Sequence, residues 1–306
     1  MPKSRIALAL FIAILAVSTG SIFIRLAQKD APSLVIAAGR LTLASLILAP
    51  VALTRHSGEL RSLTRREWGL ALLSGLFLSV HFASWVTSLE YTTVVASVVL
   101  VSTGPLWVAI LSPIFLREVP SRWAWIGMGL ALLGGIIVGL SDSCTLRGIS
   151  VTCPPLPDLL AGSAFLGNFL ALIGAWTVAG YLMIGRRLRA RIGLVPYIFF
   201  IYGVAALALI VYMFAAGETP LGYPQLTYLW ILALALIPQL IGHSTYNWAL
   251  RFMPASLVSV TTLGEPIGSA ILAFFILNET PTALTLVGGV FILAGIYLST
   301  LSPNVT

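Results

Sequence analysis

The chain has 306 residues, of which 58% are hydrophobic and only 9% are charged. Soluble domains carry about 25% charged residues, so this composition excludes an ordinary soluble protein and indicates a membrane protein. The net charge of +7 does not indicate nucleic-acid binding, because the basic residues are spread through short segments between apolar runs instead of forming one patch.

The apolar runs predict an all-helical polytopic membrane protein with ten spans, because crossing about 30 Å of hydrocarbon takes roughly 20 helical residues. In chain order the runs are Ile6–Ile24, Pro32–Thr54, Trp68–Leu89, Tyr91–Leu116, Trp123–Ser141, Leu159–Gly185, Ile192–Gly217, Leu226–Leu250, Ala255–Leu277 and Thr280–Leu301. The second run contains Arg40 and the ninth contains Glu265. The lipid bilayer is therefore one partner of the chain.

The second half of the chain repeats the first about 161 residues later. Leu89–Pro120 aligns with Leu250–Pro281 without a gap. The matched positions include Pro105 with Pro266, Glu118 with Glu279, Gly127 with Gly288 and Gly134 with Gly295. A duplicated bundle of membrane helices is typical of a secondary transporter, whose substrate path lies between the two halves.

We expect three parts: a first five-helix repeat over residues 1–142, an extracytoplasmic linker over 143–158 and a second five-helix repeat over 159–306. With the N-terminus inside, basic residues are concentrated on the cytoplasmic side, which predicts cytoplasmic termini in the inner (plasma) membrane. Because five is an odd number, the second repeat enters the membrane inverted. Inverted repeats supply two equivalent arrangements of one site, as alternating access requires.

The linker holds both cysteines of the chain, Cys144 and Cys153. On the outer side of the membrane a disulfide is permitted, and free thiols are the alternative. No histidine lies near them, so we expect no metal site there.

Several of these features together resemble EamA-type members of the drug/metabolite transporter superfamily. The resemblance rests on the duplicated ten-span pattern, on Arg40 in AAGRLTLASL, and on Pro105 and Pro266 in the fourth and ninth helices. It rests also on the acidic residues that close those helices, Glu118 in LREVP and Glu279 in LNETP. The resemblance implies a central cavity lined by helices 1, 3, 4, 6, 8 and 9, and transport of small polar metabolites, commonly amino acids and often outward.

Glu265 is the strongest candidate for a functional residue. It lies near the middle of the ninth helix, directly before Pro266, and its repeat mate is Gly104. A charge in the bilayer costs at least ~2.5 kcal/mol, and a proline opens the helix locally. Glu265 could bind a substrate ammonium group or carry a coupling proton. The alternative is a protonated glutamate hydrogen-bonded between helices.

Arg40 has two interpretations. It can hold two helices together by pairing with a carboxylate or with exposed carbonyl groups, or it can bind a substrate carboxylate directly. The cavity implied by the resemblance does not include the second helix, which favours the structural role.

Polar side chains recur on the third and eighth predicted helices. His81 and Trp85 are four residues apart, as are His243 and Asn247, and Gln239 extends the second face by one turn. These side chains could hold a zwitterion, and the histidines are candidate proton carriers. The alternative is hydrogen bonding between helices. Weaker candidates are Ser102, Thr103, Asn168, Trp176, Tyr181 and Tyr246.

Two other patterns are expected to serve the membrane structure. Gly135 and Gly139, four apart in the fifth helix, favour a close helix contact. The run RRLRAR at Arg186–Arg191 is expected to orient the chain and to contact anionic lipid headgroups.

The predicted function is secondary active export of a small-molecule substrate such as an amino acid, with a proton or another ion as the candidate coupling ion. We expect no cofactor and no metal, and a monomer or a homodimer. The alternative is a polytopic membrane enzyme acting on a lipid-linked substrate. The sequence has no GxSG-like nucleophile turn and no glycine-rich phosphate loop, so it is not expected to be an enzyme.

Overall fold

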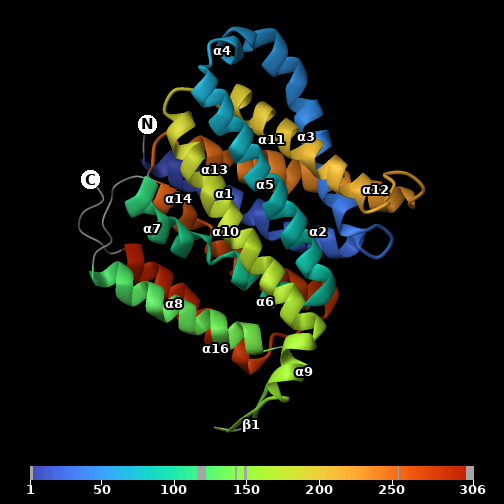
Figure 1. Ribbon diagram of the computed structural model, residues 1–306, viewed down its shortest axis with the longest axis vertical. Coiled ribbons are helices and arrows are strands. Elements are labelled where there is room, and N and C mark those ends of the chain that lie inside the picture. Colours follow the sequence, from blue (N-terminus) through green and yellow to red (C-terminus); the bar gives the residue numbers. More distant parts are fainter. Residues whose placement is uncertain (1–2, 116–121, 142, 148–149, 254, 301–306) are drawn as a thin grey trace.

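The computed structural model describes residues 3–115, 122–141, 143–147, 150–253 and 255–300, and it is almost entirely helical (Figure 1). Within these residues, 7 helices are long and apolar enough to cross a membrane. The predicted fifth, ninth and tenth spans correspond to three shorter apolar helices, Trp125–Val138, Gly264–Leu277 and Ala283–Gly295. Membrane-length helices are thus found for seven of the ten predicted spans.

The described part of the first half contains eight helices, because two of its five spans are interrupted and a short helix, α4, lies between the second and third spans. They are α1 (Lys3–Ser18), α2 (Gly20–Ala27), α3 (Ser33–Arg55), α4 (Ser57–Arg61), α5 (Arg65–Tyr91), α6 (Val94–Val101), α7 (Gly104–Phe115) and α8 (Arg122–Leu140). The long helix α5 begins with a capping box, in which Thr64 and Glu67 each bind the other's backbone N–H group. This arrangement satisfies two amides that have no partner within the helix.

A small hairpin in the linker precedes the second half, and the described part of the second half contains two π-helical segments. The elements are β1 (Thr145–Arg147), β2 (Ser150–Thr152), α9 (Leu156–Ala161), α10 (Ser163–Arg189), α11 (Leu194–Ala215), α12 (Gln225–Leu234), η1 (Ala235–His243), α13 (Ser244–Ala249), α14 (Ala255–Thr261), α15 (Gly264–Leu272), η2 (Ala273–Leu277) and α16 (Ala283–Thr300). The π-helix η1 contains Pro238, which cannot donate a backbone hydrogen bond and so disturbs the regular ladder.

Helices of the two halves pack against one another. The main pairs are α5 with α10, α3 with α11, and α8 with α16 (Figure 1). On the other side of the molecule, α1 packs on η1 and α13, and α2 packs on α12. Every one of these contacts joins the first half to the second, so the interface between the halves runs through the centre of the protein.

The pair formed by α8 and α16 is held by close backbone contact. A Cβ atom added to Gly134 would lie 2.5 Å from the carbonyl oxygen of Gly288, and one added to Gly295 would meet the carbonyl oxygen of Gly127. The two contacts run in opposite directions along the chain, so the helices are antiparallel. The expectation for Gly135 was wrong: a Cβ atom there would meet nothing within 4 Å, because the residue lies on another face of α8.

The fourth and ninth predicted helices are each interrupted shortly before their proline. Helix α6 ends at Val101 and α7 begins at Gly104, whereas α14 ends at Thr261 and α15 begins at Gly264. Pro105 and Pro266 therefore lie in the first turn of the second segment, where the missing N–H group would have no helical acceptor. The two breaks occupy positions in the repeat that are equivalent to within one residue. Glu118, which ends the fourth predicted span, lies outside the described residues.

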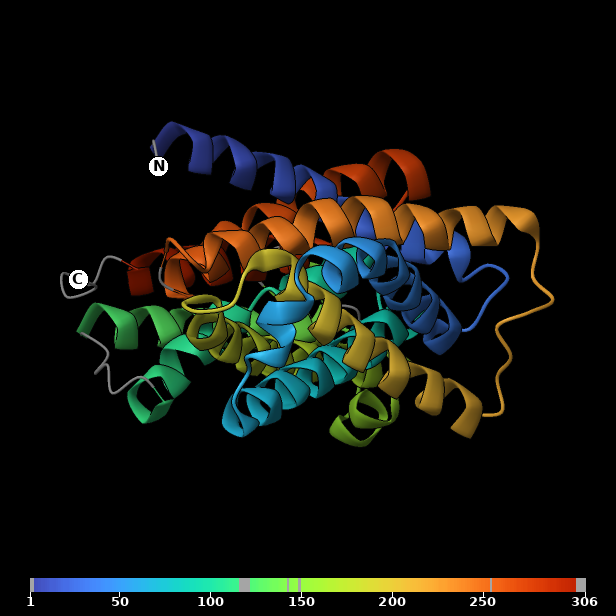
Figure 2. The ribbon, with the colours of Figure 1, turned by 90° about the horizontal axis from the view of Figure 1, so that it is seen from above.

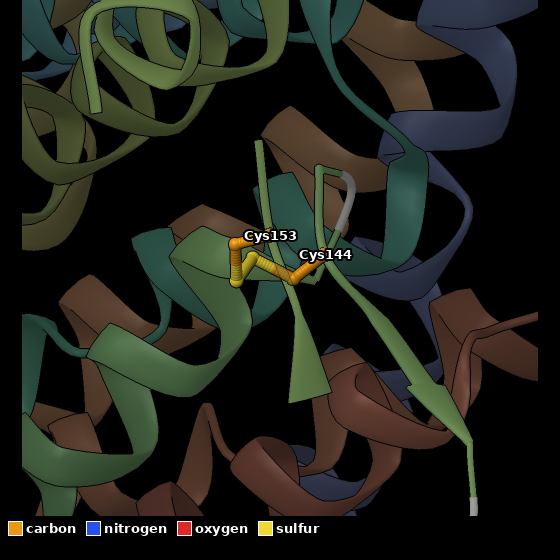
Figure 3. The surroundings of a disulfide bond; sticks show 2 residues. All are labelled: Cys144 and Cys153. Atoms are coloured by element: carbon orange, nitrogen blue, oxygen red, sulfur yellow. A yellow bond between two sulfur atoms is a disulfide. The ribbon is translucent and has the colours of Figure 1, made fainter. Parts of the chain in front are cut away.

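The linker between the halves carries the hairpin of β1 and β2, in which Thr145 pairs with Thr152. Cys144 and Cys153 flank the paired strands and form a disulfide (Figure 3). Of the two alternatives for these cysteines, the structure contains the disulfide.

The first turn of α1 and the last turn of α16 lie at the same end of the molecule in both views (Figure 2). The loop between α11 and α12 lies at the opposite end (Figure 2).

Candidate functional site

A cavity of about 60 Å³ lies at the centre of the interface between the halves. This volume holds about four water molecules, so a metabolite requires movement of the surrounding helices. The lining residues are His81, Trp85, Val101, Ser102, Gly104, Pro105, Val178, Tyr181, Leu182, His243, Tyr246, Ser259, Thr262 and Glu265. They come from the third, fourth, sixth, eighth and ninth predicted helices, and both helix breaks reach the wall.

Glu265 supplies the carboxylate of the cavity. It lies in the first turn of α15, where the helix dipole favours a negative charge. Its backbone N–H group donates to the carbonyl oxygen of Thr262, across the break. Its carboxylate accepts no hydrogen bond from the residues that the structure describes, and the residue lines the cavity.

Trp85 and Tyr246 line the cavity and carry hydrogen-bond donors. The indole Nε1 of Trp85 and the hydroxyl of Tyr246 are buried and have no partner in the described part of the chain. The repeat offset of 161 residues makes these two positions equivalent. A buried donor without a partner costs about 1–3 kcal/mol, so a ligand with acceptor atoms would relieve two such costs at once.

The two histidines extend the aromatic wall. The His81 ring stacks on Trp85 with centroids 5.9 Å apart, and the Phe82 ring contacts His81 and His243 at 4.7 and 5.4 Å. The Nδ1 atom of His81 lies 2.9 Å from the carbonyl oxygen of Gly174. Because a carbonyl only accepts, Nδ1 carries the proton, and Nε2 of the neutral ring is left as an acceptor.

Arg40 is fully buried but does not line the cavity. Its Nη2 atom donates to Oε1 of Gln239 at 2.9 Å, and its guanidinium lies 4.2 Å from the centroid of Phe82. Phe82 therefore separates Arg40 from the cavity. The contact joins α3 to η1, so the structure places both Arg40 and Gln239 in the interface between helices.

Asn247 also lies behind the cavity wall. Its amide donates to the hydroxyls of Tyr181 and Tyr202 and to the carbonyl oxygen of His243. Asn247 thus orients Tyr181, which does line the cavity. Pro266 is buried in α15 beside Glu265 and is not part of the wall.

Sequence reasoning missed five wall residues, Val101, Val178, Leu182, Ser259 and Thr262, and named Gly104 only as the repeat mate of Glu265. Two of the five could have been found from the repeat, because Val101 and Thr262 are equivalent positions, each four residues before the proline of its helix.

An ion pair joins the halves near one end of the interface. Nη2 of Arg25 lies 3.2 Å from Oε1 of Glu279, and Oε2 of Glu279 accepts from the backbone N–H group of Val94, at the start of α6. Arg25 also donates to the carbonyl oxygen of Thr92. A surface hollow of about 530 Å³, partly lined by Arg25, opens beside this pair.

The two halves, with a small cavity between them, make this a polytopic membrane protein with a duplicated helical bundle. The chain belongs to the EamA-like transporter family, whose profile matches residues 4–140 and again residues 165–301. The second match begins and ends 161 residues after the first, which is the offset of the repeat. The match confirms the resemblance to EamA-type drug/metabolite transporters.

Relatives named as transporters agree with this assignment, and a solved structure shares the fold. The chain is 24% identical over 305 residues to an uncharacterized transporter of Archaeoglobus fulgidus, covering 97% of each chain. It is 24% identical over 230 residues to the uncharacterized transporter YdfC of Bacillus subtilis, covering 74% of this chain and 70% of the relative. A protein of known crystal structure shares the fold, with a TM-score of 0.68 at 18% identity, and 98% of each chain is covered.

Proposed function

We propose that the protein is a secondary transporter that exports small polar metabolites, amino acids among them, across the plasma membrane by alternating access. The central cavity is the substrate site, and Glu265 binds either the ammonium group of the substrate or a coupling proton.

The proposed topology is two inverted five-helix repeats, residues 1–142 and 159–306, with both termini in the cytoplasm. It is supported by α8 and α16, which occupy equivalent places in the repeat and yet run antiparallel. The positions of the first turn of α1 and the last turn of α16, at one end of the molecule, are those expected for an even number of crossings.

The observation that carries the proposal is the composition of the cavity wall. Glu265 supplies one carboxylate, and Trp85 and Tyr246 supply unpartnered donors from equivalent positions in the two halves. Such a wall complements a small molecule that has both a positive group and acceptor atoms. Because the wall belongs to both halves, a relative movement of the halves alters every contact of the ligand at once.

Gating is expected at the two helix breaks and at the ion pair between Arg25 and Glu279. The ion pair ties the end of α2 to the start of α6 and to the loop after η2. We infer that it holds this side closed while the cavity is open towards the other side.

The test is transport by purified protein in liposomes, with a panel of labelled amino acids and other small metabolites, with and without a pH gradient. We expect saturable movement of one compound class that is accelerated by the gradient. Glu265→Gln should abolish the acceleration while the protein remains folded. The matched control is Glu218→Gln, which removes a carboxylate outside the cavity and should leave the acceleration unchanged.

Two outcomes would contradict the proposal in different ways. If no compound moves through folded wild-type protein, the transport function itself is wrong. If a compound moves and Glu265→Gln keeps the same response to the gradient, the coupling role of Glu265 is wrong and the transport function stands.

A further inference from the structure

An apolar groove lies on the outside of the bundle between α5, α7 and α10, away from the central cavity. Its volume is about 390 Å³, and its walls include Leu73, Phe77, Leu111 and Ile184. Trp176 and Arg187 also line it. Figure 1 shows α10 and α5 side by side along the length of the molecule.

The floor of the groove is set by close packing of α5 on α10. Gly180 has no side chain to fill the space, and a Cβ atom there would lie 2.9 Å from the ring of Phe77. The ring of Phe77 therefore lies flat against α10, and the hollow remains above it. A hollow lined by apolar side chains on a membrane-spanning surface is filled by hydrocarbon and not by water.

Trp176 and Arg187 lie eleven residues apart on the same continuous helix. At 1.5 Å per residue the separation along the axis is about 16 Å, which is close to half of the ~30 Å hydrocarbon thickness. Arg187 belongs to the last turn of α10 and is exposed, as expected for a residue at the membrane surface. Trp176 then lies near the midplane, at the depth that the end of a lipid chain reaches.

Trp176 is held in place at its end of the groove. Its ring makes edge contacts with Trp107 and Phe169, with centroids 5.3 and 6.1 Å away. Even so, 38% of its surface is exposed. It is therefore a fixed aromatic surface that a chain in the groove would touch.

Arg187 differs from the other arginines of its run. Arg186 donates to the carbonyl oxygen of Leu250, and Arg189 donates to that of Asn247. Arg191 pairs with Glu67. Within the described ranges, Arg187 has neither a hydrogen-bond partner nor an ion-pair partner.

We propose that this groove binds a phospholipid with an anionic headgroup, whose phosphate contacts Arg187 and whose acyl chain lies along α10 as far as Trp176. The charge of Arg187 complements the headgroup, and the length of the groove matches one leaflet. One basic residue near the membrane surface favours anionic over zwitterionic lipid by about fivefold.

The test uses quenching of tryptophan fluorescence by lipids with brominated chain ends. Purified protein is titrated in detergent with brominated phosphatidylglycerol and with phosphatidylcholine that carries the same chains. We expect phosphatidylglycerol to reach half-maximal quenching at about fivefold lower concentration. The quenchable fraction should fall in Trp176→Phe.

Variants of the arginine identify the headgroup contact. Arg187→Gln should abolish the preference for phosphatidylglycerol, and Arg187→Lys, which keeps the charge, should retain it. Arg55→Gln is the matched control, because Arg55 is an exposed arginine at the end of another membrane-length helix, and it should retain the preference. Folding of each variant is checked by size-exclusion chromatography and circular dichroism.

Three results would overturn the proposal. These are equal quenching of the wild type by both lipids, an unchanged preference in Arg187→Gln, and quenching that is unchanged in Trp176→Phe. Displacement of phosphatidylglycerol by millimolar inorganic phosphate would instead assign Arg187 to a soluble anion.

Discussion

Gly134 of α8 and Gly288 of α16 meet backbone to backbone. A Cβ atom on Gly134 would lie 2.5 Å from the carbonyl oxygen of Gly288, and one on Gly288 would lie 2.7 Å from that of Gly134. The second contact, between Gly127 and Gly295, is the same pair of positions exchanged by the repeat. The symmetry of the repeat therefore relates the two glycine contacts that hold α8 against α16.

Gly134→Ala should destabilise the protein, because the added methyl group would collide with a backbone atom that cannot move away alone. We expect the free energy of unfolding to fall by about 1–3 kcal/mol. The adjacent variant Gly135→Ala is the control, because its methyl group meets nothing, and a small gain from helix propensity is expected. The measurement is thermal unfolding in detergent. Equal effects of the two variants would show that the glycine contact does not hold the helices.

Arg40→Ala should reduce the amount of folded protein more than it reduces substrate affinity. It removes the hydrogen bond to Gln239 and leaves that buried amide without its partner. Hydrogen bonds to charged groups contribute about 1.5–3 kcal/mol, so a loss of that size is expected. Arg55→Ala on the same helix serves as the control. Normal unfolding temperature together with lost binding would assign Arg40 to the substrate.

Arg25→Gln should loosen the side of the protein that the ion pair closes. The side chains of Arg25 and Glu279 are 29% and 20% exposed, so solvent screens the pair, and its contribution is no more than about 1 kcal/mol, or fivefold in population. Thr93→Cys adds the one free thiol to a chain whose two cysteines form a disulfide.

The rate at which a membrane-impermeant maleimide labels this thiol reports how open that side is. Labelling should be up to fivefold faster when Arg25→Gln is also present. Lys29→Gln removes a neighbouring charge outside the pair and should leave the rate unchanged. A rate that is insensitive to Arg25→Gln would remove the pair from the gating mechanism.

Glu218 should make stability depend on pH. It lies between α11 and α12, where burial and the nearby charge of Glu90 raise the pKa of its carboxyl above the usual value of 4.5. A raised pKa in the folded state means that stability is fully present below pH 4.5 and is lost as the pH rises through the folded value. Glu218→Gln should therefore raise the unfolding temperature at pH 8 and leave it unchanged at pH 4. The same gain at both values would exclude titration of Glu218 as the cause.

The helical membrane fold and the repeat could be predicted because their signals are local. Apolar runs mark the spans, and the 161-residue offset places both proline breaks without knowledge of any contact. Contacts between segments that are distant in the chain have no comparable pattern in the sequence. Nothing in the sequence near Arg40 indicates Gln239 as its partner.

The position of Gln239 illustrates a different limit. A spacing of four residues puts side chains on one face only in a regular α-helix. The segment Ala235–His243 is a π-helix, in which each turn contains more residues, so Gln239 and His243 need not share a face. His243 lines the cavity, whereas Gln239 contacts Arg40 in the packed interior.

Two equivalent helix pairs of the repeat differ in continuity. Helices α5 and α10 are continuous over 27 residues each and pack on one another along their length. Their repeat equivalents form a pair that is jointed, because α1 and α2 are separated at Thr19 and α12 and α13 are joined by the π-helix η1. We therefore expect the pair of α5 and α10 to be stiff and the interrupted pair to bend more easily. In the proposed transport cycle, equivalent helices of the repeat would then take two different roles, one pair as the fixed frame and the other as the moving part.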